Sequence, residues 1–171
     1  MIVTPSWCAM MARYNTWQNR NLLDAADDLD EASLRQDRGA FFGSIAGTLN
    51  HLLWADLVWM SRFDGGEAPT GGIPESAGLW PDWGRFRAAR AAADRRIMGW
   101  ADRLESDHLA GDLAWFSGAA GRELNRPLAL CVGHFFNHQT HHRGQVHAML
   151  TAAGAAPGPT DLFVMPEDIG L

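Results

Sequence analysis

The residues best suited to chemistry are histidines, and five of the chain's seven lie between positions 134 and 147. His138 and His142 are four residues apart in a segment whose apolar residues have helical spacing. Side chains at i and i+4 lie on one face of a helix, so these two imidazoles could bind one metal ion. A polar helix face that happens to be rich in histidine is the alternative interpretation.

A helical wheel separates these histidines into two groups. With about 100° per residue, the large apolar residues of the segment centre at about 75° from His138. His142 lies about 35° from that centre and His138 about 75° from it, whereas His134, His141 and His147 lie at about 105–135°. We therefore expect His138 and His142 to be the metal ligands of this helix. The other three should face solvent and be dispensable for metal binding.

A third ligand has to come from another part of the chain, because zinc-type sites usually have three protein ligands and one open position. Outside the cluster the sequence offers His51 and His108. His108 follows a polar stretch that resembles a helix end, whereas His51 lies in an apolar segment, residues 45–55, expected to be buried. A single histidine there is ordinarily a core residue, but a histidine pair on another helix needs a partner. The sequence thus predicts His51 as the third ligand.

Length and composition predict a single domain over residues 1–171, with 47% apolar residues and enough chain for a proper core. No segment is long and apolar enough for a membrane span, and the first residues do not resemble a signal peptide. Two cysteines, Cys8 and Cys131, form no disulfide framework, so a cytoplasmic location is expected. The net charge is −6 and the basic residues are scattered, which makes nucleic acid a poor partner.

Apolar periodicity and helix-end residues predict an all-α protein with one short β-hairpin. Pro81 and Pro127 are expected in the first turns of their helices. After residue 157 we expect a loop with at most one helical turn. The predicted helices cover residues 7–30, 42–63, 81–106 and 127–154, with a Gly- and Pro-rich loop at 64–80 and hairpin strands at 113–117 and 122–124.

Four segments of the chain are similar to one known family. The string Asn-His-x-x-x-His-Arg-Gly-Gln at 137–145 resembles the signature of the DinB-like (damage-inducible, YfiT-related) metal-binding four-helix bundles. The segments at 50–56, 14–19 and 159–162 resemble the same family, so the similarity spans nearly the whole chain in the right order.

This resemblance implies a fold, a ligand set and an assembly. The family's metal-binding histidines correspond to His51, His138 and His142. The family fold is an up-down-down-up four-helix bundle with a long crossover between the second and third helices, here the loop at 64–80. Family members are usually dimeric, and the eight tryptophans and nearly all-apolar second helix also favour a homodimer that buries part of the first or second helix.

The resemblance also implies a range of activities. Characterised relatives include thiol-dependent transferases and isomerases that use bacillithiol, mycothiol or glutathione. A three-histidine site suits a divalent transition metal, with zinc or nickel favoured, and could bind a thiolate or activate water. We expect an enzyme that transfers a low-molecular-weight thiol to an electrophilic small-molecule substrate. A metal-dependent hydrolase and a non-catalytic, metal-stabilised dimeric bundle with a binding or stress-response role are the alternatives.

Several polar residues are candidates for the surroundings of this site. Arg143 points about 140° away from His138 on the wheel and is expected to have a structural role, such as pairing with an acid on a neighbouring helix or subunit. Cys131 lies about two turns before His138 and is expected to be a small core residue. The sequence assigns no role to Cys8. The candidate residues are Gln145 and Tyr14 for catalysis, and Asn50 and Asp56 for supporting contacts.

Overall fold

The computed structural model describes residues 3–118 and 120–169, most of which are helical. The long helices are α1 (Pro5–Asp27), α3 (Ile45–Asp64), α5 (Trp83–Ala101) and α6 (Leu128–Ala152). The shorter elements are α2 (Glu31–Arg35), α4 (Ile73–Ser76), β1 (Asp112–Ser117), β2 (Arg122–Pro127) and 3-10 turns at Ser106–Leu109 and Leu162–Val164. Among the described residues, no helix has the length and apolar character that crossing a membrane requires.

Side-chain caps define where three of the long helices begin. Thr4, Ser44 and Asp82 each accept a hydrogen bond from the backbone N–H three residues later. Such a cap satisfies one of the free donors in the first helical turn. α6 instead begins directly after Pro127, the last residue of β2, so the hairpin leads straight into the histidine-rich helix.

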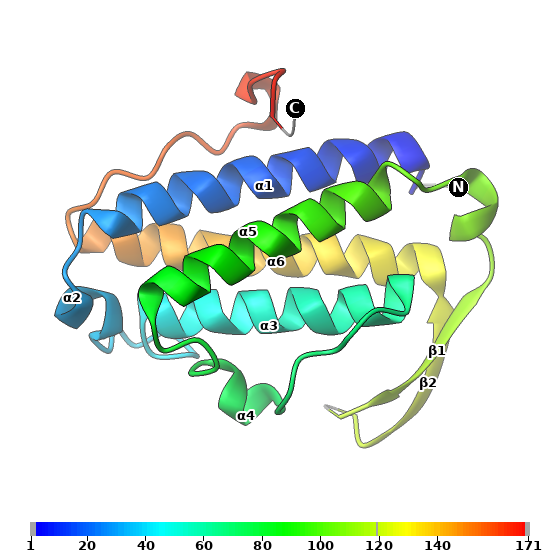
Figure 1. The fold of residues 1–171 in the computed structure, drawn as a ribbon, viewed down its shortest axis with the longest axis horizontal. Coiled ribbons are helices and arrows are strands. Elements are labelled where there is room, and N and C mark those ends of the chain that lie inside the picture. The colour runs from blue at the N-terminus through cyan, green and yellow to red at the C-terminus, as the bar shows by residue number, and fades with distance from the viewer. Residues whose placement is uncertain (1–2, 119, 170–171) are drawn as a thin grey trace.

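The long helices follow the expected up-down-down-up order. In Figure 1, α1 and α6 run in one direction and α3 and α5 in the other. Because α3 and α5 are parallel, the chain must return along the bundle between them, and residues 65–82 form this crossover. α4 lies within it.

The expected β-hairpin precedes α6. β1 and β2 pair in antiparallel register, with Trp115 opposite Leu124, and Gly121 takes a positive φ of 63° in the turn. The Trp115 ring lies edge-on against Trp59 of α3, with ring centroids 5.6 Å apart. This contact holds the hairpin against the bundle.

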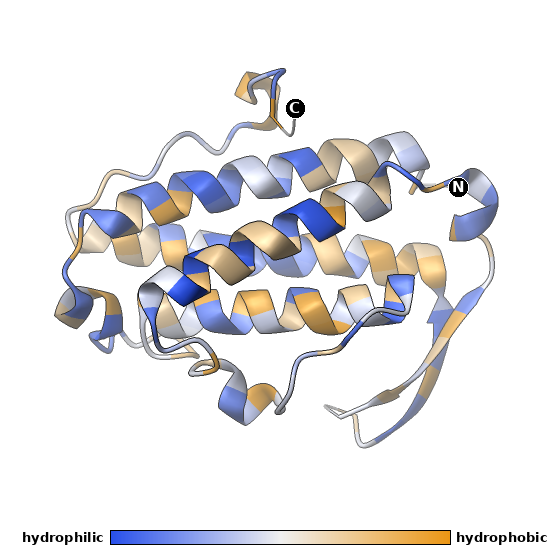
Figure 2. Ribbon diagram, viewed as in Figure 1, coloured by the Kyte–Doolittle hydropathy of each residue, from blue (hydrophilic) through white to orange (hydrophobic). Residues whose placement is uncertain are grey.

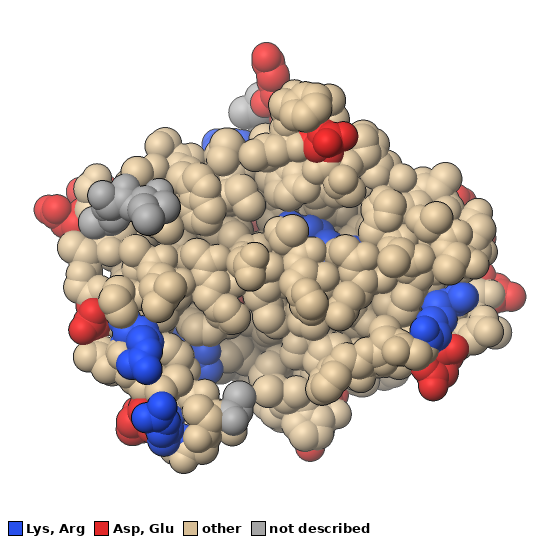
Figure 3. Space-filling view, turned by 180° about the vertical axis from the view of Figure 1, so that it is seen from behind, with Lys and Arg blue, Asp and Glu red and all other residues tan. Residues whose placement is uncertain are grey.

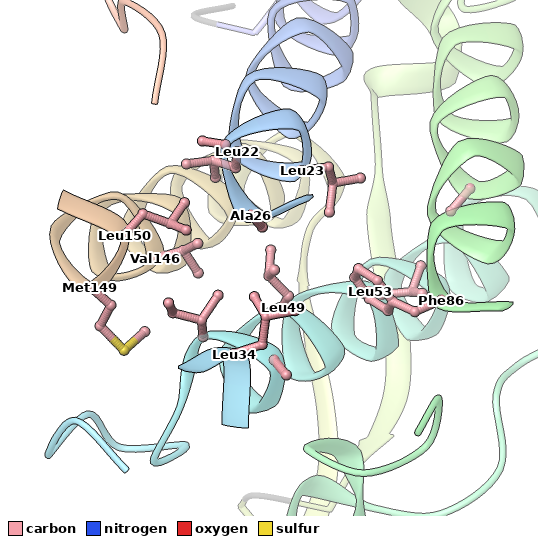
Figure 4. Packing of buried hydrophobic residues seen from close by; sticks show 14 residues of the cluster. Leu22, Leu23, Ala26, Leu34, Leu49, Leu53, Phe86, Val146, Met149 and Leu150 are labelled. Carbon is pink, nitrogen blue, oxygen red and sulfur yellow. The ribbon is translucent and has the colours of Figure 1, made fainter. Parts of the chain in front are cut away.

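Two apolar clusters fill the bundle, one towards each end. Hydrophobic residues recur at intervals along every long helix, between hydrophilic ones (Figure 2), and many of these hydrophobic residues are buried in the bundle. Figure 4 shows the first cluster, in which Leu22 and Ala26 of α1, Leu49 of α3, Phe86 of α5 and Val146 of α6 converge. The second cluster, around Phe135 and Phe136 of α6, lies nearer the hairpin end.

A layer of buried polar side chains separates the two apolar clusters. Every long helix contributes to it at the middle of its length, and all of its members are at most 5% exposed. We call this set the polar layer; it consists of Asn15 and Asn19 from α1, Asp56 from α3, Arg90 and Asp94 from α5, and Gln139 and Arg143 from α6.

Hydrogen bonds and ion pairs connect the polar layer across all four helices. Arg90 donates to Asp56 at 2.7 Å and forms an ion pair with Asp94 at 2.9 Å, which joins α5 to α3. Gln139 donates to Asp56 at 3.0 Å and joins α6 to α3. Burial raises the pKa of both carboxyl groups, and the adjacent Arg90 guanidinium opposes that rise.

The α1 side of the polar layer is built from amides. Asn19 and Asn15 donate to Asp94, at 2.8 and 3.3 Å, and Arg143 of α6 donates to Asn15. Arg143 also lies over the Tyr14 ring. Arg143 thus has the structural role expected of it, although its hydrogen-bond partner on the neighbouring helix is an amide and not an acid.

Several predicted helix boundaries were wrong for identifiable reasons. The first helix ends at Asp27, and Asp30 caps the separate helix α2. The second predicted helix, α3, begins only after its N-cap Ser44. The third predicted helix, α5, ends at Ala101 rather than 106. Pro81 lies before Asp82, the N-cap of α5, and Pro127 is itself the N-cap of α6. Neither proline therefore lies in a first helical turn. The crossover loop also contains α4, which the sequence did not predict. The final segment has one 3-10 turn, as expected.

Replacing Arg90 by Met should strongly destabilise the fold, because Asp56 and Asp94 would stay buried without their cation. We expect the free energy of unfolding to fall by about 3–5 kcal/mol in urea titrations. Arg87→Met is the matched control: Arg87 lies one turn earlier on α5 and contacts Asp24 and Asp27 at the surface. Its loss should cost less than about 1 kcal/mol. Equal losses in the two variants would show that the polar layer has no special role.

Candidate metal centre

Three histidines from two helices converge beside the polar layer. His51 comes from α3, and His138 and His142 come from successive turns of α6. One ring nitrogen from each lies within 4.8 Å of the others, and the Nε2 atoms of His138 and His142 are 3.1 Å apart. His51 and His142 are buried and His138 is partly buried. The structure thus brings together the trio that the sequence predicted.

The packing of α3 against α6 creates this convergence. Gln139, the residue after His138, hydrogen-bonds Asp56, which follows His51 by five positions. This bond fixes the two helices in the register that places the histidines opposite one another. Phe42 stacks on the His51 ring with centroids 3.7 Å apart, which limits how far that ring can turn.

The histidines of the trio are neutral at pH 7. Burial, and secondly the charge of His142, lower the pKa of His51 to about 4. Burial and the neighbouring histidines lower the pKa of His138 to about 3, and burial also lowers the pKa of His142. Neutral imidazoles keep a free lone pair, which is the form that binds metal ions.

Hydrogen bonds from two of the three histidine rings, to Ser76 and to Gln145, select which ring nitrogen is free to bind a metal. The Ser76 hydroxyl donates to the carbonyl of Ile73, so it accepts from Nδ1–H of His51 at 2.9 Å. The Gln145 side-chain oxygen likewise accepts from Nδ1–H of His142 at 2.8 Å. Both rings therefore leave Nε2 unprotonated. Hydrogen bonds of this kind orient metal-binding histidines in proteins.

The trio fits a tetrahedral metal ion in donor type and spacing. Nitrogen atoms about 2.0–2.1 Å from a shared tetrahedral ion are separated by roughly 3.3 Å. The His138–His142 separation of 3.1 Å is close to that value, and all three donors lie within 4.8 Å. Among the described residues, the donor group contains no carboxylate or thiolate, so the ligands would leave the ion's charge uncompensated.

The remaining histidines lie outside the trio, as expected. His134 and His141 are exposed, and His141 pairs with the Gln145 amide. His147 lines a separate pocket, and the His108 ring accepts a hydrogen bond from the backbone of Glu105. His134 nevertheless lines the same pocket as the trio, so it does not simply face bulk solvent.

The other candidate residues divide between the site and the rest of the bundle. Gln145 hydrogen-bonds His142 and so orients a candidate ligand. Tyr14 donates to the carbonyl of Thr160 and lines the separate pocket beside His147. Asn50 fixes the crossover by accepting from the N–H of Trp80, and Asp56 belongs to the polar layer.

A pocket of about 1090 Å³ lies over the trio, between α3, α6, the crossover and the hairpin. Its walls are rich in aromatic side chains, among them Phe42, Trp54, Trp59 and Trp115. Cys131 also lines it but is only 3% exposed, whereas Cys8 is fully buried elsewhere in the core. Among the described residues that line the pocket, none is acidic.

Sequence reasoning missed Ser76, Phe42 and Gln139. Ser76 and Phe42 lie in connecting segments, where no periodicity shows which way a side chain faces. Gln139 could have been found, since a helical wheel places it about 100° from His138, close to the apolar centre at about 75°. A polar residue at such a position indicates a buried hydrogen bond.

Comparison with known proteins assigns the chain to a family. The model of the DinB family matches residues 1–168. The chain belongs to the DinB family. It is 25% identical over 163 residues to Protein DinB of Bacillus subtilis (strain 168), covering 86% of this chain and 87% of that protein. No solved structure matches the chain.

We expect one divalent metal ion per chain, lost when a histidine of the trio is removed. Metal analysis after dialysis should show sub-stoichiometric metal in His51→Ala and His138→Ala. The triple variant of His134, His141 and His147 to Ala should retain the full amount. Undiminished metal in both single variants would rule out the trio, and loss in the triple variant would mean that α6 is rotated from the orientation described here.

Replacing Ser76 by Ala should weaken metal binding without unfolding the protein, because His51 would lose the contact that selects its tautomer. We expect the metal dissociation constant to rise by about 10–100-fold in competition with a chelator. Ser61→Ala is the matched control, because the Ser61 hydroxyl makes the same local bond, to the carbonyl of Val58, away from the trio. Equal affinities for the two variants would show that Ser76 does not orient His51.

Proposed function

We propose that this DinB-family protein binds a divalent transition metal, zinc or nickel, through His51, His138 and His142. We propose further that it transfers a low-molecular-weight thiol to an electrophilic small molecule. The observation that carries this proposal is a neutral three-histidine donor set at the floor of a pocket of about 1090 Å³. A pocket of this size admits small organic molecules to the open side of the site.

The chemistry supplied by a metal bound there would be Lewis-acid stabilisation of a thiolate at neutral pH. The residues of the chain prepare the site for it. Ser76 and Gln145 direct Nε2 of His51 and His142 towards a common point. Phe42 and Trp54 provide apolar walls beside His51.

The lining of the pocket favours thiol transfer over hydrolysis. Metal-dependent hydrolases commonly place a carboxylate beside the ion as a general base for water. Among the described lining residues there is no aspartate or glutamate. A thiol is far more acidic than water, so it needs no such base once its anion is stabilised. A non-catalytic, metal-stabilised bundle remains the second candidate, supported by the packing of the trio beside the polar layer.

Metal-loaded protein should accelerate the conjugation of bacillithiol, mycothiol or glutathione to a reactive electrophile such as 1-chloro-2,4-dinitrobenzene. His142→Ala should reduce kcat/KM on the order of 100-fold, because a ligand is removed. His141→Ala is the matched control, because His141 is the exposed neighbour of His142, and this variant should retain the wild-type rate. Equal rates for wild type and His142→Ala with every thiol would remove the transfer proposal. Ester hydrolysis that depends on the trio but needs no thiol would favour the hydrolase.

We also propose a homodimer in the cytoplasm. On the side opposite to Figure 1, the middle of the surface carries few charged side chains (Figure 3). The large exposed apolar side chains include Phe41 in the loop before α3, Phe116 in the hairpin and Leu130 in α6. Among the described residues, no large exposed apolar side chain belongs to α1 or α3. The two free cysteines, Cys8 and Cys131, suit a reducing compartment.

Light scattering at micromolar concentration should give twice the chain mass. Leu130→Glu would place a charge on an exposed apolar position and should shift the mass towards the monomer. A monomeric wild type would contradict the dimer, and a dimeric Leu130→Glu would place the interface elsewhere.

A further inference from the structure

One arginine in the wall of the pocket lies against two tryptophans. The guanidinium carbon of Arg62, on α3, lies 4.6 Å from the ring centroid of Trp59 and 5.4 Å from that of Trp115 in the hairpin. The side chain is partly buried. Together the two rings, whose centroids are 5.6 Å apart, restrict the position of the guanidinium group.

The guanidinium N–H groups of Arg62 make no hydrogen bond to any residue that the structure describes. Within the part of the chain that the structure describes, Arg62 takes part in no hydrogen bond or ion pair with another side chain. The other arginines buried in or against the bundle differ, since Arg90, Arg96 and Arg143 each donate to a carboxylate or an amide. A cation–π contact occupies no hydrogen-bond donor of a guanidinium, so the N–H groups of Arg62 stay available to a ligand.

The charged side chains that line the pocket are basic. The charged residues among its described lining are Arg62 and Arg126, and no acid offsets them. Burial lowers the pKa of Arg62, as expected for a cation in apolar surroundings without a carboxylate beside it. The trio adds no negative charge. An anion entering this pocket therefore meets attraction from its walls before any metal is considered.

Arg62 lies at a distance from the trio that a small molecule can span. The Trp59 ring beneath Arg62 contacts His134 with centroids 5.2 Å apart, and His134 contacts His138 at 5.7 Å. Arg62 and the trio are thus separated by two aromatic side chains along one wall. A ligand that contacts both must be elongated, with its anionic group at the end away from the trio.

We propose that Arg62 binds the carboxylate of an elongated organic acid whose other end reaches the histidine trio. A guanidinium presents two parallel N–H donors that match the two oxygens of a carboxylate, and tryptophan walls suit the apolar body of such a ligand. This names the substrate class for the proposed function, and it rests on that function only in taking this pocket as the substrate site.

The test compares 2-naphthoate with its neutral analogue 2-naphthamide by isothermal titration calorimetry, on metal-loaded and chelator-treated protein. Neither probe carries a thiol. Wild type should bind naphthoate about tenfold more tightly than naphthamide. Arg62→Gln should bind the two equally while keeping the wild-type affinity for naphthamide. The matched control is Arg122→Gln, which removes the same charge from an exposed hairpin residue outside the pocket lining and should keep the full ratio.

The outcomes distinguish Arg62 from the metal. A tenfold ratio that survives chelation but disappears in Arg62→Gln supports the proposal, even if the trio proves to hold no metal. A ratio that disappears on chelation but survives in Arg62→Gln overturns it, because the carboxylate then binds the metal. Equal binding of both probes by wild type, or loss of naphthamide binding in Arg62→Gln, also overturns it. In the last case, Arg62 shapes the pocket without selecting charge.

Discussion

A buried layer of charged and amide side chains fixes the register of the four long helices, and the histidine site depends on that register. Apolar packing alone fixes the register of neighbouring helices weakly, since one hydrophobic side chain can replace another of similar size with little loss of stability. A buried carboxylate does not tolerate it, because an unpaired charge in the core is costly. Asp56 accepts from Arg90 on α5 and from Gln139 on α6, so α3 has one satisfactory position relative to both neighbours. In that position, His51 faces His138 and His142.

The trio is polar and largely buried, and its members contact one another as well as the side chains that orient them. Nε2 of His138 and Nε2 of His142 lie 3.1 Å apart, and Nδ1–H of His142 is already committed to Gln145. Without an ion, Nε2–H of one ring can donate to the lone pair of the other, and an ion bound here would replace that hydrogen bond. The structure therefore combines a framework, fixed by the polar layer, with a donor set that could hold a metal ion. The aromatic pocket above it, with Arg62 in its wall, is the proposed substrate site.

Sequence reasoning reached the centre of the site but not its support. His138 and His142 could be predicted because both lie on one long helix, where the wheel angle states which way a side chain faces. His51 followed from the need for a third ligand and from the apolar segment around it. Ser76 could not be predicted, because its position depends on how the crossover folds back onto α3. The boundary errors at residues 30, 42 and 106 arose where a local cap or turn residue began or ended a helix that periodicity alone would have extended further. The polar layer was missed as a unit, since its partners are far apart in the chain.

X-ray absorption at the metal edge of the loaded protein reports the ligand atoms themselves, so it shows whether α3 and α6 together hold the ion. We expect three imidazole nitrogens around the ion, with one fewer in His51→Ala. A first shell with sulfur from the chain, or one that stays unchanged in His51→Ala, would contradict the claim that α3 and α6 together build the metal site.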